Sequence, residues 1–249
     1  MKKEEKIAEI CGIHAGDGYL RNDGRRVEWD ISGNIEEKNY YDKEVIPLFN
    51  KIFDLNIKGR FFKGRNTYGF VIRNKKIIEF AHKKLEFPYG SKSLIVKIPN
   101  FILNKKPLLF SFLRGYFDTD GHMGFTKKTG NYSYFKRNRD YYPRIMFTTV
   151  SKNLSRDLQR TFGKLGFKFM YTTHKPKRKT ENLRYIIHLN GVKNLERWID
   201  LIGTKNNTKY SRFLIWKNFG FCPTKTTYVK RLEILKNLVD PNSLYGPVV

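Results

Sequence analysis

The sequence predicts an α+β fold made of two pseudo-symmetric copies of one αββαββα unit. Three observations lead to this prediction. The segment 7–18 recurs as 110–121, alternating and helical patterns follow both copies in the same order, and 249 residues hold two such units and a tail. The identical positions share one offset of 103 residues: Gly12, Asp17 and Gly18 match Gly115, Asp120 and Gly121.

Each recurring segment is expected to be a helix, and periodicity predicts the elements that follow it. In the first unit, alternating stretches cover 19–32 and 57–73, and helical patterns cover 40–54 and 75–86. In the second unit, the alternating stretches are 122–150 and 168–189, and the helical patterns are 152–165 and 192–202.

Shorter echoes support this register at an offset of 113 residues: Phe49-Asn-Lys51 resembles Phe162-Gly-Lys164, and Gly90-Ser-Lys92 resembles Gly203-Thr-Lys205. We therefore divide the chain into a first repeat (1–87), a linker rich in proline (88–107), a second repeat (108–220) and a C-terminal helix and tail (221–249). The extra helix is expected over 225–239.

Charge is the strongest compositional signal. The chain carries 49 Lys and Arg residues against 23 Asp and Glu, a formal net charge of +26. Such an excess predicts a polyanionic partner, with nucleic acid the leading class. A generally cationic surface is the alternative, but it would concentrate its lysines in tails or amphipathic helices, whereas here basic and aromatic residues are interleaved.

The remaining composition bounds the setting. Cys11 and Cys222 are too few and too far apart for a disulfide framework or a thiolate metal site, so a reducing cytoplasm is expected, or an organelle if the gene lies in an organellar genome. The N-terminal apolar stretch is too short and too charged for a signal peptide or a membrane span. No membrane partner is expected.

Both recurring helices carry a ridge of small residues. Ala8, Gly12 and Gly16 recur at every fourth position of the first helix, and Ser111, Gly115 and Thr119 do the same in the second. Glycine inside a helix costs about 1 kcal/mol relative to alanine, so its matched use predicts a close backbone approach. We expect the two ridges to pack on each other. The alternative is that each helix packs only on its own sheet.

Crossing along the ridges would bring Asp17 and Asp120 together beyond the two helix ends. A carboxylate at a helix C-terminus opposes the helix dipole, and two neighbouring carboxylates repel each other. A bound cation would offset both unfavourable interactions. Oxygen ligands without Cys or His favour Mg²⁺, with Mn²⁺ or Ca²⁺ as substitutes for binding, and phosphodiester hydrolysis follows from such a site. The alternative is that each Asp-Gly pair forms an ordinary turn, which explains one copy better than two copies at matching positions of the repeat.

The two motifs resemble a known family. Gly12-Ile-His-Ala-Gly-Asp-Gly18 and Leu113-Arg-Gly-Tyr-Phe-Asp-Thr-Asp-Gly121 are similar to the paired signatures of LAGLIDADG homing endonucleases in their single-chain form, and the resemblance spans nearly the whole chain. It implies that Asp17 and Asp120 bind the catalytic metals, with the carbonyl groups of Gly16 and Thr119 as auxiliary ligands. It also implies a β-saddle over duplex DNA, with the motif helices at its centre.

The chain departs from the family pattern at two positions. The first acidic residue of the motif is Asp118 in the second copy but Ala15 in the first. His14 replaces an apolar residue, and we expect it to pack within the helix rather than bind metal.

The resemblance further implies a lysine near each metal site. Lys97, in Lys97-Ile-Pro-Asn100, fits this element after the first repeat. After the second repeat we favour Lys205, with Lys209 as its competitor. A lysine so placed would stabilise the transition-state phosphate or help to activate water.

The alternating segments place basic side chains on the face of each sheet that helices would leave open, and this face would meet DNA. The basic residues of this face include both base contacts and phosphate contacts, which the sequence pattern leaves undivided. The candidates in the first unit are Arg21, Arg25, Arg26, Arg60, Lys63, Arg65 and Arg73. Those in the second are Lys127, Lys128, Arg137, Arg139, Arg144, Lys175, Lys177, Arg178 and Arg184.

These observations favour a metal-dependent endodeoxyribonuclease that acts as a monomer and cuts both strands of an asymmetric duplex, and the resemblance implies that this duplex is long. One alternative keeps the scaffold without cleavage, as a maturase-like RNA-splicing cofactor or a DNA-binding protein. Retention of both Asp17 and Asp120 counts against it. A generic basic RNA-binding protein would explain the charge but not the twin motifs.

Overall fold

The computed structural model describes residues 1–127, 139–176, 178 and 180–245. Two units with the same element order make up most of the chain, as predicted. The first contains α1 (Lys3–Asp17), β1 (Gly18–Asn22), β2 (Val27–Asn34), α3 (Ile46–Phe53), β3 (Arg60–Phe62), β4 (Thr67–Ile72) and α4 (Lys75–Leu85). The second contains α6 (Lys106–Thr119), β5 (His122–Thr126), β6 (Tyr142–Thr149), α7 (Lys152–Lys164), β7 (Met170–His174), β8 (Arg184–Asn190) and α8 (Val192–Leu201).

The two four-stranded antiparallel sheets have equivalent topologies, β1-β2-β4-β3 and β5-β6-β8-β7. The connection from β2 to α3 contains a 3₁₀ turn, η1 (Ile35–Glu37), and two short helical turns, α2 (Lys38–Tyr40) and η2 (Tyr41–Val45). The predicted α+β class and the αββαββα repeat are therefore confirmed.

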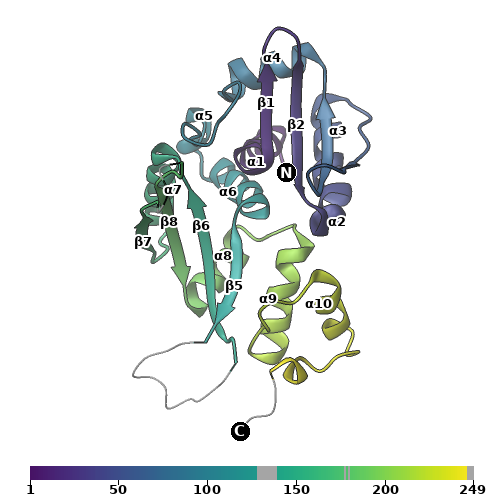
Figure 1. Ribbon diagram of the computed structural model, residues 1–249. Helices are drawn as coiled ribbons and strands as arrows, with labels where there is room; N and C mark the ends of the chain where they lie inside the picture. The colour runs from purple at the N-terminus through teal and green to yellow at the C-terminus, as the bar shows by residue number, and fades with distance from the viewer. Residues whose placement is uncertain (128–138, 177, 179, 246–249) are drawn as a thin grey trace.

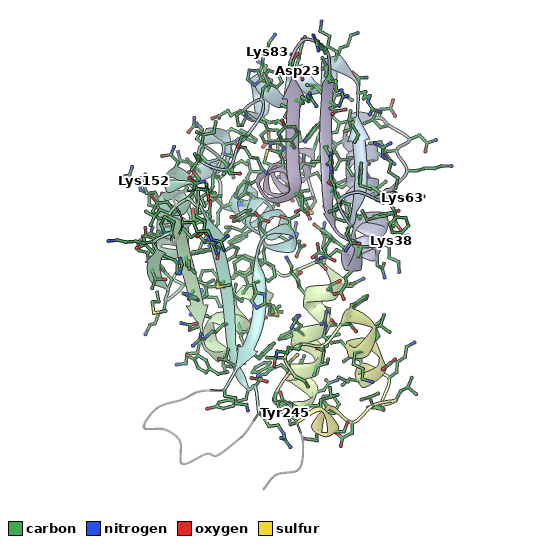
Figure 2. All side chains as sticks on the ribbon, viewed as in Figure 1. Asp23, Lys38, Lys63, Lys83, Lys152 and Tyr245 are labelled. Carbon is green, nitrogen blue, oxygen red and sulfur yellow. The ribbon has the colours of Figure 1, made fainter. Side chains whose placement is uncertain are left out.

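Alternation along the strands separates a core face from an open face. Trp29, Ile31 and Phe70 fill the core behind the first sheet, and Ile145 and Phe147 fill the core behind the second. The opposite face of each sheet carries polar and basic side chains. Figure 2 shows that Asp23, in the β1–β2 turn, and Lys63, in the β3–β4 turn, lie at the periphery of the first sheet.

Helices α1 and α6 lie side by side at the centre, between the two sheets (Figure 1). A Cβ atom on Gly12 would lie 2.1 Å from the carbonyl oxygen of Phe112, and one on Gly115 would lie 2.3 Å from that of Glu9. Only glycine permits backbones this close. The predicted packing of the two ridges is confirmed.

In the described part of the chain, three helices lie outside the αββαββα pattern. The predicted linker contains α5 (Asn100–Leu103), and the expected C-terminal helix is present as α10 (Tyr228–Leu235). The helix α9 (Asn207–Phe219), which packs against α10, was not distinguished in the sequence. A final 3₁₀ turn, η3, covers Pro241–Leu244. In the described part of the chain, no helix combines the length and apolar character needed to cross a membrane.

Candidate active site at the ends of the central helices

The crossing of α1 and α6 brings the two helix C-termini together. Asp17 is the last residue of α1, and Asp120 caps α6. Between them, Gly16 is packed so closely that a Cβ atom there would lie 2.1 Å from Oγ1 of Thr119 and 3.3 Å from the Asp120 carboxyl carbon. The small-residue ridge therefore positions both carboxylates at one site, as the sequence predicts.

Asp17 is held by a residue outside the motif. The hydroxyl group of Tyr41 donates a 2.6 Å hydrogen bond to Oδ2 of Asp17. Burial, reinforced by the charges of Asp120 and Glu37, nevertheless raises the pKa of Asp17 to about 7. Gly33 makes this geometry possible, because a Cβ atom there would lie 2.6 Å from Oδ2 of Asp17.

Asp120 has a different environment. Desolvation by the surrounding protein raises its pKa, and the ammonium groups of Lys92 and Lys209 oppose this shift. The two carboxylates thus carry negative charge that the protein only partly neutralises. They form two related but inequivalent half-sites.

One lysine reaches the end of each central helix. Nζ of Lys92 donates a 2.8 Å hydrogen bond to the carbonyl oxygen of Gly16. Nζ of Lys209, on the first turn of α9, donates to the carbonyl oxygens of Phe117 and Thr119 at 2.6 and 2.7 Å. Gly16 and Thr119 are equivalent in the repeat, so Lys92 and Lys209 are pseudo-symmetric partners. Burial lowers the pKa of both amines, and the neighbouring carboxylates oppose the shift.

These contacts correct the predicted positions of Lys97 and Lys205. Nζ of Lys97 pairs with Glu86 at 2.7 Å, and Lys97 lines a separate small cavity with His14 and Pro99. Nζ of Lys205 pairs with Glu9 at 2.8 Å. Neither ammonium group pairs with Asp17 or Asp120. Lys92, from the Gly90-Ser-Lys92 echo, reaches Gly16, and Lys209, the alternative to Lys205, reaches Thr119.

Asp118 and Ala15, equivalent in the two motifs, differ in what they contact. Asp118 is fully buried and accepts hydrogen bonds from Oγ1 of Thr204 and, at 2.9 Å, from the backbone N–H of Lys205. Burial raises its pKa to about 7. Its carboxylate thereby fixes the loop that leads into α9 and Lys209. Ala15 makes no such connection and lines a cavity beside Lys92.

A further carboxylate near the site was not predicted. Glu37, in η1, accepts a 2.7 Å hydrogen bond from Nδ2 of Asn206, which also donates to the carbonyl oxygen of Asp118 at 2.7 Å. Asn206 is the N-cap of α9. This network links the first repeat to the helix that carries Lys209. No periodicity or motif marks it, because the two residues are 169 positions apart.

His14 packs in the core, as expected. Its Nδ1 accepts a 3.0 Å hydrogen bond from Nε1 of Trp29, and its ring stacks on Phe87 at a centroid distance of 3.8 Å. Burial lowers its pKa well below the usual value.

The donor set suits a hard divalent cation. Asp17 and Asp120 offer carboxylate oxygens, and the Gly16 and Thr119 carbonyl groups lie beside them. Among the described residues, no group of three or more His, Cys, Asp or Glu side chains could enclose a metal. A cation here would complete its shell with water or phosphate oxygens, which is how Mg²⁺ is commonly held. An open cavity of about 400 Å³, lined by Lys92, Asp120 and Arg184 among others, leaves room for them.

The predicted DNA-binding residues lie in different settings. Strand register puts Arg21, Arg60, Arg144 and Arg184 on the open faces. Turns or positions just beyond strands hold Arg25, Arg26, Lys63, Arg65, Arg73, Lys127, Lys175 and Arg178. Arg139 instead packs on the C-terminal segment, with its guanidinium 4.7 Å from the Tyr245 ring centroid and a 3.3 Å bond from Nε to Asn242. Lys128, Arg137 and Lys177 lie outside the described residues.

Comparisons with known proteins agree with this architecture. Residues 107–203 match the family model of the LAGLIDADG-like domain. The chain also resembles solved structures of the meganucleases I-SmaMI, bound to uncleaved DNA target in the presence of calcium ions, and I-AabMI, bound to uncleaved DNA. The TM-score is 0.53 for both, with 11% and 12% identity; coverage is 95% of this chain and 94% of the first, and 97% and 98% for the second.

The same fold occurs in the N-terminal LAGLIDADG domain of DUF199/WhiA, with a TM-score of 0.52, 12% identity and coverage of 82% and 83%. In sequence, an uncharacterized protein of Methanocaldococcus jannaschii is 31% identical over 144 residues, 54% of this chain and 47% of the relative. A probable translation initiation factor IF-2 of that organism is 27% identical over 129 residues, 49% of this chain and 10% of the factor. The chain thus spans about half the length of the first relative and a tenth of the second.

Fold and site together define a two-repeat protein whose central helices each end in an acidic residue. Its second repeat matches the LAGLIDADG-like domain, and the whole chain has the two-repeat fold of the solved LAGLIDADG meganucleases, as the sequence motifs predict.

Proposed function

We propose that the protein is a site-specific endonuclease that hydrolyses both strands of a long, asymmetric duplex DNA with the help of Mg²⁺. The observation that carries the proposal is the meeting of Asp17 and Asp120 at the crossing of α1 and α6, each beside a carbonyl group that holds a lysine ammonium. Carboxylates set against the helix dipoles and against each other are stabilised by a cation.

The side chains have distinct tasks in this proposal. Asp17 and Asp120 would hold the metal, whose chemistry is to activate water and to stabilise the leaving oxygen. Tyr41 orients Asp17 and favours its ionised form. Lys92 and Lys209 would each supply positive charge at the end of one central helix, where negative charge would develop on a scissile phosphate.

The two sheets would hold the duplex. Their open faces flank the central helices, and β-ribbons fit the major groove. Because the residues on the two faces differ, the target should be asymmetric. One chain contains both half-sites, so it should act as a monomer.

We extend the proposal to homing, in which the coding sequence of the enzyme lies inside a host gene, either within an intron or as part of an intein. The match to a tenth of an initiation factor is what an inserted element would contribute to a longer host protein.

Selection of cleaved sites from a randomised duplex library tests the proposal. With Mg²⁺, the protein should yield one long asymmetric consensus cut on both strands, and with chelator it should yield none. Asp17→Asn and Asp120→Asn should remove cleavage while duplex affinity persists. Asp200→Asn, at an exposed position of α8, is the control and should cut normally.

Undiminished cutting by both aspartate variants would overturn the mechanism. Because a fold alone does not select an activity, two other outcomes are informative. Selective duplex binding without cutting would identify a DNA-binding protein, and selective binding of a structured RNA would identify a maturase-like cofactor.

A further inference from the structure

Three arginines on the DNA-binding side of the first sheet are paired with carboxylates. Arg21 contacts Asp23 at 2.5 Å, Arg73 contacts Glu28 at 3.5 Å, and Arg65 contacts Asp30 at 2.7 Å. The third pair differs from the others because its carboxylate is buried: the Asp30 residue is 7% exposed, whereas the Arg65 side chain is 63% exposed.

Two contacts hold the Arg65 guanidinium. Nη1 donates to Oδ2 of Asp30, and Cζ lies 5.5 Å from the ring centroid of Phe62. The other oxygen of Asp30, Oδ1, is enclosed and has no hydrogen-bond partner in the described part of the protein. The buried carboxylate therefore depends on Arg65, and the arginine is held with most of its side chain exposed.

This pairing is unsuited to a phosphate contact. A buried carboxylate cancels most of the charge that an arginine would offer to a phosphate, and it would itself be repelled by DNA. The pairing still fixes the orientation of the planar guanidinium, and the remaining N–H groups of Arg65 are available to a ligand. Such a group suits a guanine edge, where O6 and N7 accept two parallel hydrogen bonds.

We propose that Arg65, oriented by Asp30, reads a guanine in the major groove of the first half-site. This inference rests on the proposed function and separates one base-reading residue from the other basic residues of the sheet. Strand register also gives the position. Asp30 lies opposite Tyr19, two residues after Asp17, so the guanine should lie at the inner end of the half-site, next to the cleaved segment.

The second sheet provides a contrast. In the described residues, Arg144 and Arg184 occupy its open face and form no ion pair within 4.0 Å. Their full charge remains available to DNA. Among the described residues of the two sheets, ion pairs between an arginine and a carboxylate lie on the first sheet.

A charge-neutral double variant tests the proposal. Asp30→Asn/Arg65→Gln removes one positive and one negative charge. Bound duplexes are selected from a randomised library with Ca²⁺, so that the readout is binding. The double variant should lose preference for one inner guanine by about 5- to 150-fold, with the salt dependence of binding unchanged. An unchanged preference at every position would overturn the proposal.

Replacing the selected guanine with 7-deazaguanine, which lacks the N7 acceptor, completes the test. The replacement should weaken binding by the wild-type protein and have no further effect on the double variant. Equal losses for both proteins would contradict a contact between Arg65 and this base.

Lys63→Gln, in the same turn as Arg65, removes one positive charge and should weaken binding to all duplexes alike while the preference for this guanine persists. Loss of the same guanine preference in this variant would overturn the assignment to Arg65. Selective binding without cleavage would contradict the proposed nuclease while leaving the base contact intact. A wild-type protein that binds all duplexes equally would overturn both.

Discussion

The hydroxyl group of Tyr41 donates a 2.6 Å hydrogen bond to Oδ2 of Asp17, so a residue from outside the repeated motif holds one of the two central carboxylates. This bond favours the ionised form of Asp17, whose pKa burial raises to about 7. Metal binding requires that ionised form.

Tyr41→Phe should therefore raise the pKa of Asp17 further and shift the acidic limb of the cleavage profile to higher pH. The rate should fall most near neutrality and recover as pH rises. Single-turnover cleavage across pH measures the effect. Tyr40→Phe is a matched control, because the buried Tyr40 hydroxyl has no hydrogen-bond partner among the described residues. Identical profiles for the two variants would contradict the role of Tyr41.

Exchange of the lysines distinguishes the structure from the sequence prediction. Lys92→Met and Lys209→Met should each slow cleavage by about 10²–10³-fold, because each removes a fixed positive charge from one half-site. Nicked duplex should accumulate when one strand is cut faster than the other. Lys97→Met and Lys205→Met are the controls. A greater loss in these controls than in Lys92→Met and Lys209→Met would restore the original assignment.

The helix crossing should tolerate no side chain at its closest point. Gly12→Ala would place Cβ 2.1 Å from the Phe112 carbonyl oxygen, so we expect a loss of about 1–3 kcal/mol in the free energy of unfolding, together with reduced cleavage. Gly163→Ala, where Cβ would meet nothing within 4 Å, should instead stabilise α7 by about 0.5–1 kcal/mol. Denaturant unfolding of both variants measures the difference, and equal stabilities would contradict the close packing.

A buried ion pair joins the two central helices. Nη2 of Arg114, on α6, lies 3.0 Å from Oε2 of Glu9, on α1, whose residue is 1% exposed. Arg114→Met should destabilise the protein by about 3–5 kcal/mol, because it leaves Glu9 buried with only partial compensation from Lys205. Glu9→Gln/Arg114→Met should recover much of this loss in a double-mutant cycle of unfolding. Simple additivity of the two single changes would contradict direct coupling.

The buried Asp118 makes stability depend on pH. Its pKa is about 7 in the folded protein and near 3.9 in an unfolded chain, so between these values only the unfolded form loses the proton. Its contribution to stability is therefore present below pH 4 and is lost as pH rises to 7, by up to about 4 kcal/mol. Asp118→Asn should flatten this part of the unfolding free-energy profile in chelator. An unchanged slope would contradict the raised pKa.

Much of the architecture could be read from the sequence because it depends on local spacing. The offset of 103 residues aligned Asp17 with Asp120, and the small-residue ridges predicted the approach of Gly12 to Phe112. Periodicity identified the strands and their helices. The helix α9 was missed because its polar and apolar residues show little segregation into separate faces.

The lysines show where local spacing failed. Lys92 follows Asp17 by 75 residues, and Lys209 follows Asp120 by 89, so the two partners have no common offset. Lys92 lies in the connection between repeats, whereas Lys209 lies on a helix that the first repeat lacks.

The sequence by itself determined the two repeats, the crossing of their first helices and the aspartates at the helix ends, because helix and strand periods fix which residues share a face. Only the tertiary structure decided that Lys92, Lys209, Tyr41 and Glu37 complete the surroundings of these aspartates. Their side chains come from connecting segments and an added helix, whose paths depend on packing over the whole chain. The repeat offset aligns Lys92 with Lys205 rather than with Lys209, so position along the sequence does not predict which side chains meet.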